Sequence, residues 1–481
     1  MKRLIYIILT ALSFCVVASA QHNFRTGYFL DGYTYNHKLN PALASDRGYF
    51  AIPVLGYTTL GVETNMSLAK FLYPDGKGNL DLFLSPNVSA NDFLKGIQTN
   101  NPINANLDLS VFSLGFHAGK SFNTLDLSFK ADARSNLPGS LFSWAKQAGN
   151  VLDMSDFGVN ADARVEFSYG YSRKIGEKLR IGAKLKFIAA LAKASYAADH
   201  LILTMNEDKW RLTSQGSGYF YAPGVSIQTD DLRHINGIDI LSDNEKIIEA
   251  ALNARNFGAA LDLGFTYDIF NWLTVSASVT DLGGVRWSGL SKLGSDAYSV
   301  EYSGFDNIGN EDQDVEATLS DLGDELIEMI QPKVMSTDNT LIEMLSMTAH
   351  AGLELRLPFY KRLSAGLLAT HKVNGPHSWT EGRFSVNWAL LRWFSLAANY
   401  AVSDFGQSYG GAVNLHPKGF SIFLGTDSFR PFTSFSTTMV PLNDLNTNVV
   451  FGLNFPFGKY NGRFPKKIKE KKSRESESDM D

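Results

Sequence analysis

The sequence predicts an all-β protein: an antiparallel transmembrane β-barrel of about 14 strands (range ~12–16) with small helices in its extracellular loops. Three observations favour this fold class. Apolar and polar residues alternate over runs of about ten residues, the length a tilted strand needs to cross a bilayer core. Short and long connections alternate along the chain, as in outer-membrane barrels. Outside the N-terminal segment, no apolar stretch reaches the length of a membrane-spanning helix.

The clearest alternation lies in residues 257–287. From Phe257 to Ile269 the odd positions are apolar, and the positions between them are small or polar. After a turn at Phe270-Asn271 the pattern resumes from Leu273 to Val279. A period of two places alternate side chains on opposite faces of a strand. The segment is therefore predicted to be a membrane-spanning hairpin.

Composition agrees with a barrel of which only one face meets lipid. Hydrophobic residues make up 44% of the chain, and mean hydropathy is −0.10. Aromatic residues make up 12%, which suits the interfacial girdles of such barrels. The formal net charge of −5 provides no basis for a nucleic-acid partner.

Residues 1–20 read as a secretory signal peptide. Lys2 and Arg3 precede an apolar run, and small residues precede an expected cleavage after Ala20. The single cysteine, Cys15, lies inside this segment, so the mature chain is expected to have no disulfide.

Residues 21–48 are polar and aromatic without periodicity, which predicts a periplasmic lead-in or a hatch inside the barrel. The barrel itself is assigned to residues 49–458. Its first strand is expected within 51–66, and a short helix near 90–98 follows a cap pattern at Ser89 and Asp92.

Alternation then continues from Leu107 to the end of the barrel. Short turns are expected after Gly119, Ile175, Ile269, Pro358, Ala389 and Pro417, and longer connections fall between them. Strands are predicted around 125–131, 161–169, 179–187, 348–357, 362–371, 382–389, 393–403, 408–416, 418–426 and 446–457. With both chain ends on the periplasmic side, the count is about 14. It becomes about 16 if 212–227 contains two spanning strands.

Helices are expected in two long connections. Residues 242–254 begin with a Ser242/Glu245 cap pattern, and 311–347 suggests two helices, the second led by Leu341 and Leu345. The stretch 293–332 is rich in acids and reads as a solvated loop, with a calcium site as the sharper alternative. Residues 459–481 read as a charged, disordered periplasmic tail.

Alternation also assigns a set of charged residues to the lumen of the barrel. Both signs are present, so the set fits either a salt-bridge network that fills the barrel or a polar conduit or ligand site. The candidates are Asp126, Lys130, Asp132, Asp162, Arg164, Glu166, Arg180, Lys184, Lys186, Asp262, Asp268, His350, Glu354, Arg356 and Arg383.

No motif in the sequence indicates catalysis. It has no Gly-x-Ser-x-Gly elbow, no His-Glu-x-x-His pair and no phosphate-binding loop. The expectation is therefore a protein that is not an enzyme and has no cofactor, catalytic residue or metal ligand.

Several short motifs resemble a group of outer-membrane barrels of unknown function, similar to FadL-type channels and PorV-like barrels. They are Asp281-Leu282-Gly283 followed by Trp287, Asn40-Pro41-Ala42, Asn91-Asp92-Phe93-Leu94, and Leu137-Pro138-Gly139 leading to Gly149-Asn150. The resemblance implies a barrel of about 14 strands with an N-terminal hatch. FadL-type channels are expected to bind hydrophobic ligands along an apolar path.

Two functional hypotheses follow, and a soluble secreted β-protein is a third. The first is an outer-membrane channel or binding barrel for a small hydrophobic or amphipathic molecule. The second is a scaffold barrel that docks secretion or cell-surface proteins through its loops. In both, the expected setting is the outer membrane of a Gram-negative bacterium. The barrel is expected to be a monomer, with outer-membrane lipid and a small molecule or a surface protein as partners.

Overall fold

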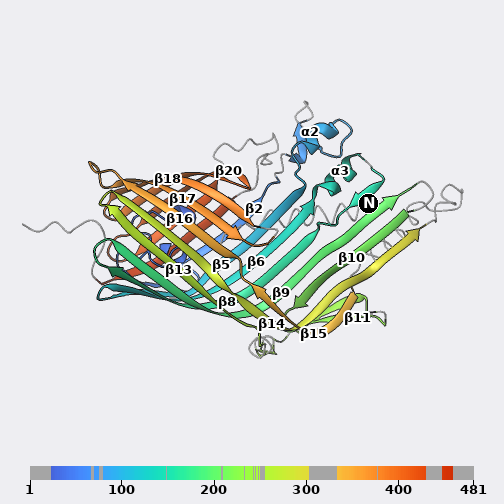
Figure 1. Cartoon of the computed structure of the whole chain (residues 1–481), viewed down its shortest axis with the longest axis horizontal. Helices are drawn as coiled ribbons and strands as arrows, with labels where there is room; N and C mark the ends of the chain where they lie inside the picture. The colour runs from blue at the N-terminus through green and yellow to red at the C-terminus, as the bar shows by residue number, and fades with distance from the viewer. Residues whose placement is uncertain are drawn as a thin grey trace, which may run out of the picture.

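The computed structural model is a closed antiparallel barrel of 14 strands (Figure 1). It describes residues 23–458 except 67–69, 75–79, 148, 207–209, 232, 242, 244, 247–248, 250–254, 303–332, 376–377 and 430–446. The predicted signal peptide with its Ala20 cleavage site and the predicted tail 459–481 therefore lie outside the described residues.

Most wall strands of the barrel follow the predicted alternation, whereas the short strands in the connections and the strand at 333–344 were not predicted. Their bounds are β1 Gly48–Ala51, β2 Thr58–Thr64, β3 Leu72–Pro74, β4 Leu80–Leu82, β5 Asn100–Ala118, β6 Ser121–Pro138, β7 Val151–Asp153, β8 Gly158–Ile175, β9 Leu179–Met205, β10 Trp210–Tyr221, β11 Val225–Thr229, β12 Ile235–Ile240, β13 Phe257–Phe270, β14 Leu273–Tyr302, β15 Lys333–Met344, β16 Met347–Arg356, β17 Leu363–Val373, β18 Trp379–Leu391, β19 Phe394–Ser403, β20 Gly406–Leu415, β21 Ser421–Phe429 and β22 Thr447–Phe457.

The first wall strand of the barrel is built in two pieces. β1 pairs with both β5 and β22, at Tyr49↔Gly115 and Tyr49↔Pro456. β2 also pairs with both strands, further along them. Together β1 and β2 close the barrel between its second strand and its last.

The structure explains why the strand count is 14 rather than 16. β10 includes most of the segment 212–227, for which two spanning strands were considered. It pairs with residues 193–205 of β9 and 291–302 of β14. β13 pairs with residues 179–189 of β9 and 273–286 of β14. Ala189 of β9 pairs with Phe257 of β13, and Lys193 pairs with Tyr221 of β10. β10 and β13 therefore stand end to end in one position of the wall. β11 pairs only with β12, outside the barrel sheet.

On one side of the barrel, long strands extend beyond the rim at the end that carries α2 and α3 (Figure 1). β9 has 27 residues and β14 has 30, compared with 10 each in β16 and β19. β15 pairs with the outer part of β14 and adds a further strand to this protruding wall. Leu293–Tyr302, at the start of the acidic stretch, is the end of β14 rather than a loop; the described residues do not include 303–332.

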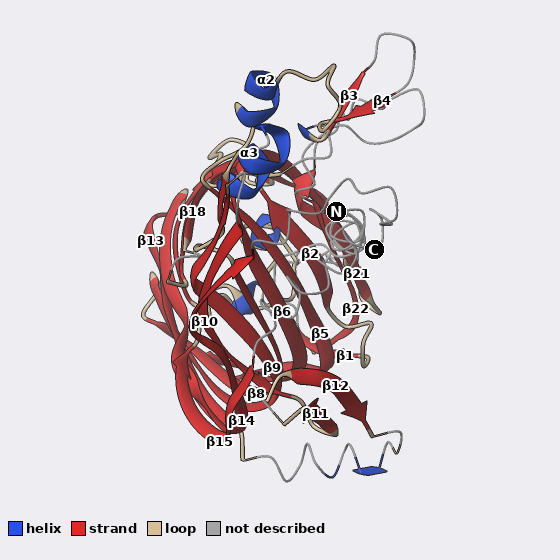
Figure 2. Cartoon of the chain, turned by 90° about the vertical axis from the view of Figure 1, so that its right-hand side faces the viewer, coloured by secondary structure: helices blue, strands red, loops and turns tan. Residues whose placement is uncertain are grey.

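The two ends of the barrel carry different connections. Short turns join β5 to β6, β8 to β9, β13 to β14, β16 to β17, β18 to β19 and β20 to β21, as predicted. All of these turns lie at one end, together with the start of β1 and the end of β22. The opposite end carries the long connections and the helices (Figures 1 and 2).

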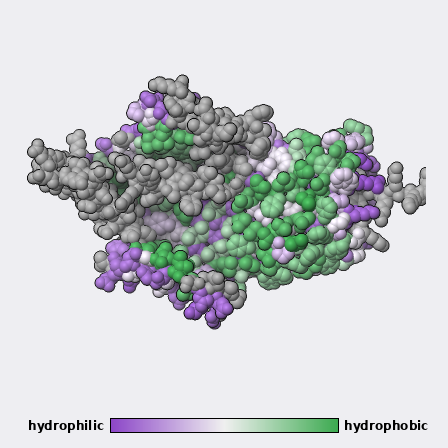
Figure 3. Space-filling view, turned by 180° about the vertical axis from the view of Figure 1, so that it is seen from behind, coloured by the Kyte–Doolittle hydropathy of each residue, from purple (hydrophilic) through white to green (hydrophobic). Residues whose placement is uncertain are grey.

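Large apolar side chains face outward around the barrel. In the hairpin β13–β14 they include Leu263, Phe265 and Tyr267, each at least 40% exposed. A band of hydrophobic residues covers the outer face of the barrel in Figure 3. Aromatic residues also gather near the short turns: Phe270 stacks on Trp272, and Trp388 Nε1 donates a hydrogen bond to Tyr360 Oη. An apolar band with an aromatic girdle is what a membrane-spanning barrel presents to lipid.

Two α-helices lie at the end with long connections. α2 (Ala90–Leu94) follows the predicted cap residue Ser89, and α3 (Gly139–Gln147) was not predicted. Phe93 and Phe142 pack with Phe71 in a small core of their own. The helix expected around Leu341 and Leu345 is wrong, because this segment forms β15 and the turn after it. Most of the helix expected at 242–254, and the first of the two helices expected within 311–347, lie outside the described residues.

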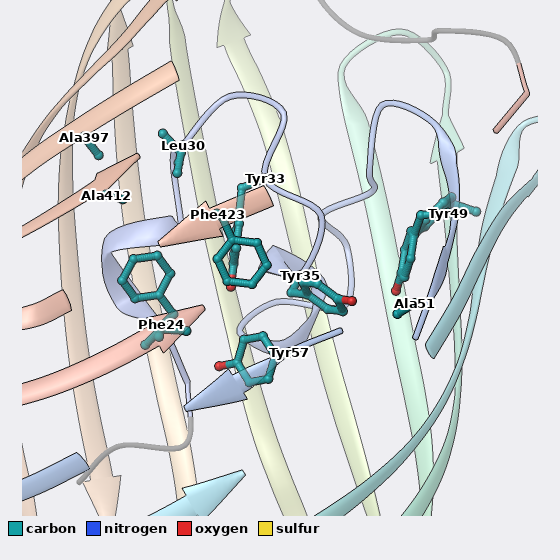
Figure 4. Packing of buried hydrophobic residues seen from close by; sticks show 12 residues of the cluster. Phe24, Leu30, Tyr33, Tyr35, Tyr49, Ala51, Tyr57, Ala397, Ala412 and Phe423 are labelled. Atoms are coloured by element: carbon teal, nitrogen blue, oxygen red, sulfur yellow. The ribbon is translucent and has the colours of Figure 1, made fainter. Parts of the chain in front are cut away.

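Residues 23–47 lie inside the barrel and form its plug. Two 3-10 helices, η1 (Arg25–Gly27) and η2 (Asn36–Lys38), give it local structure. Phe24, Tyr33 and Tyr35 belong to a buried cluster with Phe423 of β21 and Tyr57 (Figure 4). Edge-on ring contacts join these aromatics, with Tyr33 and Phe423 at 5.0 Å. The plug is thus packed into the lumen as a core rather than loosely placed.

Candidate functional site: the plugged lumen and its cavity

Glycines in the wall make room for the plug. A Cβ on Gly264 of β13 would overlap Asn40 Oδ1, and a Cβ on Gly182 of β9 would overlap the Pro41 backbone. Asn40 Nδ2 donates to Tyr28 Oη at 3.0 Å and to the carbonyls of Phe265 and Ala277 at 3.3 Å each. Asn40-Pro41-Ala42, one of the motifs that carried the resemblance, is therefore the part of the plug seated against the β13–β14 hairpin.

A buried carboxylate anchors the start of the plug. Asp427 of β21 accepts hydrogen bonds from the backbone N–H groups of Arg25 (3.0 Å) and Thr26 (2.6 Å) and from Thr26 Oγ1. The Arg25 guanidinium lies 3.0 Å from Glu381 of β18. These charged groups are almost fully buried, so each depends on the others for the hydrogen bonds it would make in water.

A ring of hydrogen bonds surrounds His37 of the plug. Lys184 Nζ donates to His37 Nδ1 and to Asp126, and His37 Nε2 lies 2.8 Å from Tyr49 Oη. Tyr49 Oη lies 3.0 Å from Ser113 Oγ, which donates to Asp126 at 2.6 Å. Since Nδ1 accepts from the lysine, a neutral His37 carries its proton on Nε2 and donates to Tyr49. Every group in the ring then has a partner of the correct kind.

Higher in the lumen, Lys186 lies between two carboxylates. Its Nζ is 2.9 Å from Asp262 and 2.6 Å from Asp281. Asp262 also accepts the Asp281 backbone N–H at 2.8 Å, where Asp281 has a φ of 62°. This bulge in β14 turns the Asp281 carboxylate toward Lys186. The hydrogen bond from the Asp281 backbone N–H to Asp262 of β13 fixes that orientation.

A second charged cluster lies beside this one, on β6 and β8. Lys130 Nζ is 2.6 Å from Glu166, and Arg164 contacts Asp132 at 2.8 Å and Glu166 at 2.9 Å. The charges in this part of the lumen are therefore largely paired with one another.

All of the predicted lumen residues lie in strands that the structure describes. Ten are buried: Asp126, Lys130, Asp132, Glu166, Lys184, Lys186, Asp262, His350, Glu354 and Arg383. Asp162, which pairs with Arg164, also belongs to the charged clusters. Three candidates lie in smaller contacts near the short turns: Asp268 accepts from Thr274 Oγ1, Arg356 pairs with Glu354, and Arg180 donates to Ser172.

Of the two hairpin aspartates assigned to the lumen, Asp262 meets Lys186 of β9, whereas Asp268 hydrogen-bonds within its own hairpin. Sequence reasoning missed Arg25, His37, Glu381, Asp427 and Glu343. The plug residues show no periodicity, and Glu381 and Asp427 lie just beyond the predicted ends of their strands, where extending the alternation by one or two residues would have found them.

A cavity lies in the lumen above the plug, toward the long connections. It holds about 1220 Å³ of unfilled space, counting the solvent at its mouth. Its lining combines plug residues, charged wall residues, amides and two tryptophans: Asn23, Arg25, Asn104, Ala105, Asn106, Lys130, Asp132, Arg134, Asp162, Arg164, Ala190, Asp281, Val285, Trp287, Glu343, Met344, Leu345, Ser346, Thr348, His350, Thr370, Lys372, Asn374 and Trp379. The two charged clusters thus form part of its walls.

One contact spans the cavity. Arg134 of β6 donates a hydrogen bond to Asn374 Oδ1 at 3.3 Å, and Ser346 Oγ donates to the same oxygen at 2.7 Å. Strand order places β6 and β17 on opposite sides of the barrel. The contact therefore divides the space above the plug.

Neither a metal centre nor a spanning helix was found where the structure describes the chain. No group of three or more His, Cys, Asp or Glu side chains there could hold a metal ion. Likewise, none of the described helices is long and apolar enough to cross a membrane.

Comparison with known proteins gives a family and several fold relatives. The model of a family of unknown function, DUF5723, matches residues 41–427. No curated protein matched the sequence. The solved structures to which the chain is similar include the toluene transporter TodX of P. putida, at 11% identity and a TM-score of 0.44, covering 92% of this chain and 100% of that one.

Two further structures are similar at the same level. The toluene transporter TbuX of Ralstonia pickettii matches at 9% identity and a TM-score of 0.43, covering 91% of this chain and 99% of that one. A FadL homologue of Pseudomonas aeruginosa matches at 9% identity and a TM-score of 0.41, covering 92% and 99%. The sequence motifs resembled a group of outer-membrane barrels of unknown function, similar to FadL-type and PorV-like barrels, and the matched family of unknown function and the FadL-type structures agree with the first two parts of that resemblance.

Proposed function

The chain belongs to the DUF5723 family, and we propose that it is an outer-membrane barrel that binds and admits a small amphipathic molecule through the cavity above its plug. The observation that carries this proposal is the arrangement of the lumen. A membrane-facing barrel is blocked by residues 23–47 and retains an open cavity on the side of the long connections. Ligand sites are typically such concave spaces with a few convergent polar groups.

The apolar band on the outer face supports a membrane location for the barrel, and the arrangement of the connections supports its orientation in that membrane. Short turns face the periplasm in outer-membrane barrels, and long loops face outward. In this orientation the cavity, which Asn23 helps to line, opens to the outside, and the start of β1 and the end of β22 face the periplasm. The barrel closes on itself within one chain, which supports a monomer in contact with outer-membrane lipid.

The lining supports an amphipathic rather than a purely apolar molecule. Trp287, Trp379 and Val285 offer apolar surface, whereas most of the remaining lining is charged or amide-bearing. A hydrocarbon in this space would remove polar groups from water without replacing their hydrogen bonds.

Proteoliposomes provide the test. Purified protein would be reconstituted, and binding and uptake of small aromatic probes would be measured for the wild type and for Thr348→Trp, which places an indole in the cavity. Thr380→Trp, at an exposed position of β18, is the matched control. The proposal expects the cavity variant to lose binding and uptake while the control keeps them. Equal behaviour of both variants and the wild type would contradict it.

The protruding wall favours a second function, a scaffold that docks secretion or cell-surface proteins. β9, β10, β14 and β15 extend beyond the rim, and the lobe of α2 and α3 stands at the same end. Cross-linking in intact cells tests this function. A protein captured by cysteines in β10, with no loss of capture in Thr348→Trp, would support it over the cavity function.

A further inference from the structure

Several polar atoms at the cavity have no hydrogen-bond partner within the described part of the chain. They are Asn104 Oδ1 and Asn106 Oδ1 on β5, and His350 Nε2 on β16. Asn104 and Asn106 are two residues apart, so both project to the same side of their strand. His350 is 3% exposed, and its other ring nitrogen lies 3.0 Å from Thr370 Oγ1. Buried polar atoms normally have hydrogen-bond partners, so these three atoms leave unused hydrogen-bonding capacity in residues that line the cavity.

The charged groups around them are already engaged with one another. Lys130 meets Glu166, and Lys186 meets Asp281, at 2.6 Å each. Glu343 lies 2.7 Å from Lys193, which is the register partner of Asp162 on the neighbouring strand. An ionic ligand would have to break one of these close pairs and leave its partner buried and unpaired, which is costly. The lining therefore presents hydrogen-bonding groups with little unsatisfied charge.

The unpartnered atoms also constrain the kind of hydrogen bond a ligand must make. Two amide oxygens require a donor. His350 Nε2 can donate or accept, depending on which of its nitrogens carries the proton. A hydroxyl group both donates and accepts, so a molecule with several hydroxyls can satisfy these atoms whichever tautomer is present.

We propose that the cavity binds a neutral, multiply hydroxylated molecule, such as a sugar ring bearing an apolar substituent, through Asn104, Asn106 and His350. This inference rests on the proposed function and names its substrate class. Strand order places β16 across the lumen from β5, so such a ligand would reach both walls. Trp287 and Val285 lie in the same lining and contribute apolar surface for its carbon skeleton.

Four aromatic probes with different head groups test the inference. Phenyl β-D-glucoside carries neutral hydroxyls, benzoate an anion, benzylammonium a cation, and toluene no head group. Equilibrium binding and proteoliposome uptake would be measured for the wild type, Asn104→Ala/Asn106→Ala and His350→Leu. Asn387→Ala is the matched control, because its amide oxygen is also buried without a partner but does not line the cavity. Heat-modifiable migration on a gel would show that each variant retains the folded barrel.

The inference expects phenyl β-D-glucoside to bind most tightly. Its affinity should fall about tenfold in the double asparagine variant and several-fold in His350→Leu, since each lost hydrogen bond has a modest net value. Asn387→Ala should leave it unchanged. Tighter binding of benzoate or benzylammonium, or unchanged glucoside binding in both cavity variants, would overturn the hydroxyl assignment and leave the proposed function standing. Tightest binding of toluene would overturn both the hydroxyl assignment and the amphipathic ligand of the proposed function. Failure of all four probes to bind or enter would overturn the proposed function itself.

Discussion

Asn40 of the plug lies against Gly264 of β13 so closely that no side chain can stand between them. The same asparagine donates to the carbonyls of Phe265 and Ala277, which belong to the two strands of the hairpin. The wall therefore holds the plug partly by hydrogen bonds and partly by a missing side chain. The hairpin that gave the strongest strand pattern in the sequence is also the seat of the plug.

Substitution of Gly264 should open the barrel. In Gly264→Val the branched side chain would overlap Asn40, so the plug must shift away from the hairpin. We expect a higher single-channel conductance and faster liposome swelling than in the wild type. Gly382→Val is the control, because a Cβ at Gly382 meets nothing within 4 Å. Matching conductance in Gly264→Val and Gly382→Val would show that Asn40 does not hold the plug in place.

Loss of Asp427 should release the start of the plug. Asp427→Ala leaves the N–H groups of Arg25 and Thr26 without their acceptor and removes a counterion of Arg25. Breaking a buried charge pair costs about 3–5 kcal/mol. We expect trypsin to cleave after Arg25 in reconstituted protein, with the wild type resistant at that bond. Glu177→Ala, in the exposed turn between β8 and β9, should behave as the wild type. A protected Arg25 in Asp427→Ala would contradict the anchoring role.

The stability of the barrel should depend on keeping the charges of Lys186, Asp262 and Asp281 together. Lys186→Met leaves Asp262 and Asp281 buried together without a cation, and should lower the free energy of unfolding by about 3–5 kcal/mol. Adding Asp262→Asn and Asp281→Asn removes both negative charges and should restore most of the loss. Urea unfolding in lipid or detergent measures the difference. A triple variant as unstable as Lys186→Met would mean that packing, rather than charge, explains the loss.

Position in the bilayer should decide the cost of a charge on the outer face. Leu263 lies in the middle of β13 and Leu391 at the short turn after β18, and both are exposed. Arginine costs about 2–4 kcal/mol near the bilayer midplane and about 0–1 kcal/mol near an interface. Leu263→Arg should therefore destabilise the folded barrel much more than Leu391→Arg in phospholipid vesicles. Equal losses would place the membrane elsewhere on the barrel.

Local alternation was sufficient to predict the strands of the barrel. Residues 257–270 and 273–279 lie on strands, and the turn is formed by Asn271 and Trp272, one residue later than predicted. Alternation reports which face a side chain occupies, but not which strand lies beside it. For this reason the sequence could not place β10 above β13 between the same two neighbours.

Short periodic signals were ambiguous in a different way. Leu341 and Leu345 are four residues apart, which fits one face of a helix, but two positions of equal parity also share one face of a strand. Both pack against the apolar cluster around Trp287 and Leu290, so the lumen-facing side of β15 and its turn accounts for the spacing. Sequence patterns could not assign the plug contacts at all, because Arg25, His37 and Asn40 meet partners from distant strands and follow no period.

The end-to-end placement of β10 and β13 separates the membrane barrel from the wall above it. Asn256 accepts the Ala190 backbone N–H, so the chain leaves β9 and re-enters the barrel sheet at nearly the same point. The segment between these residues can lengthen, shorten or be exchanged without changing how many strands close the barrel. Evolution could therefore graft a new outer structure at this junction, and the same junction offers a site where a foreign domain could be inserted for display on a cell surface.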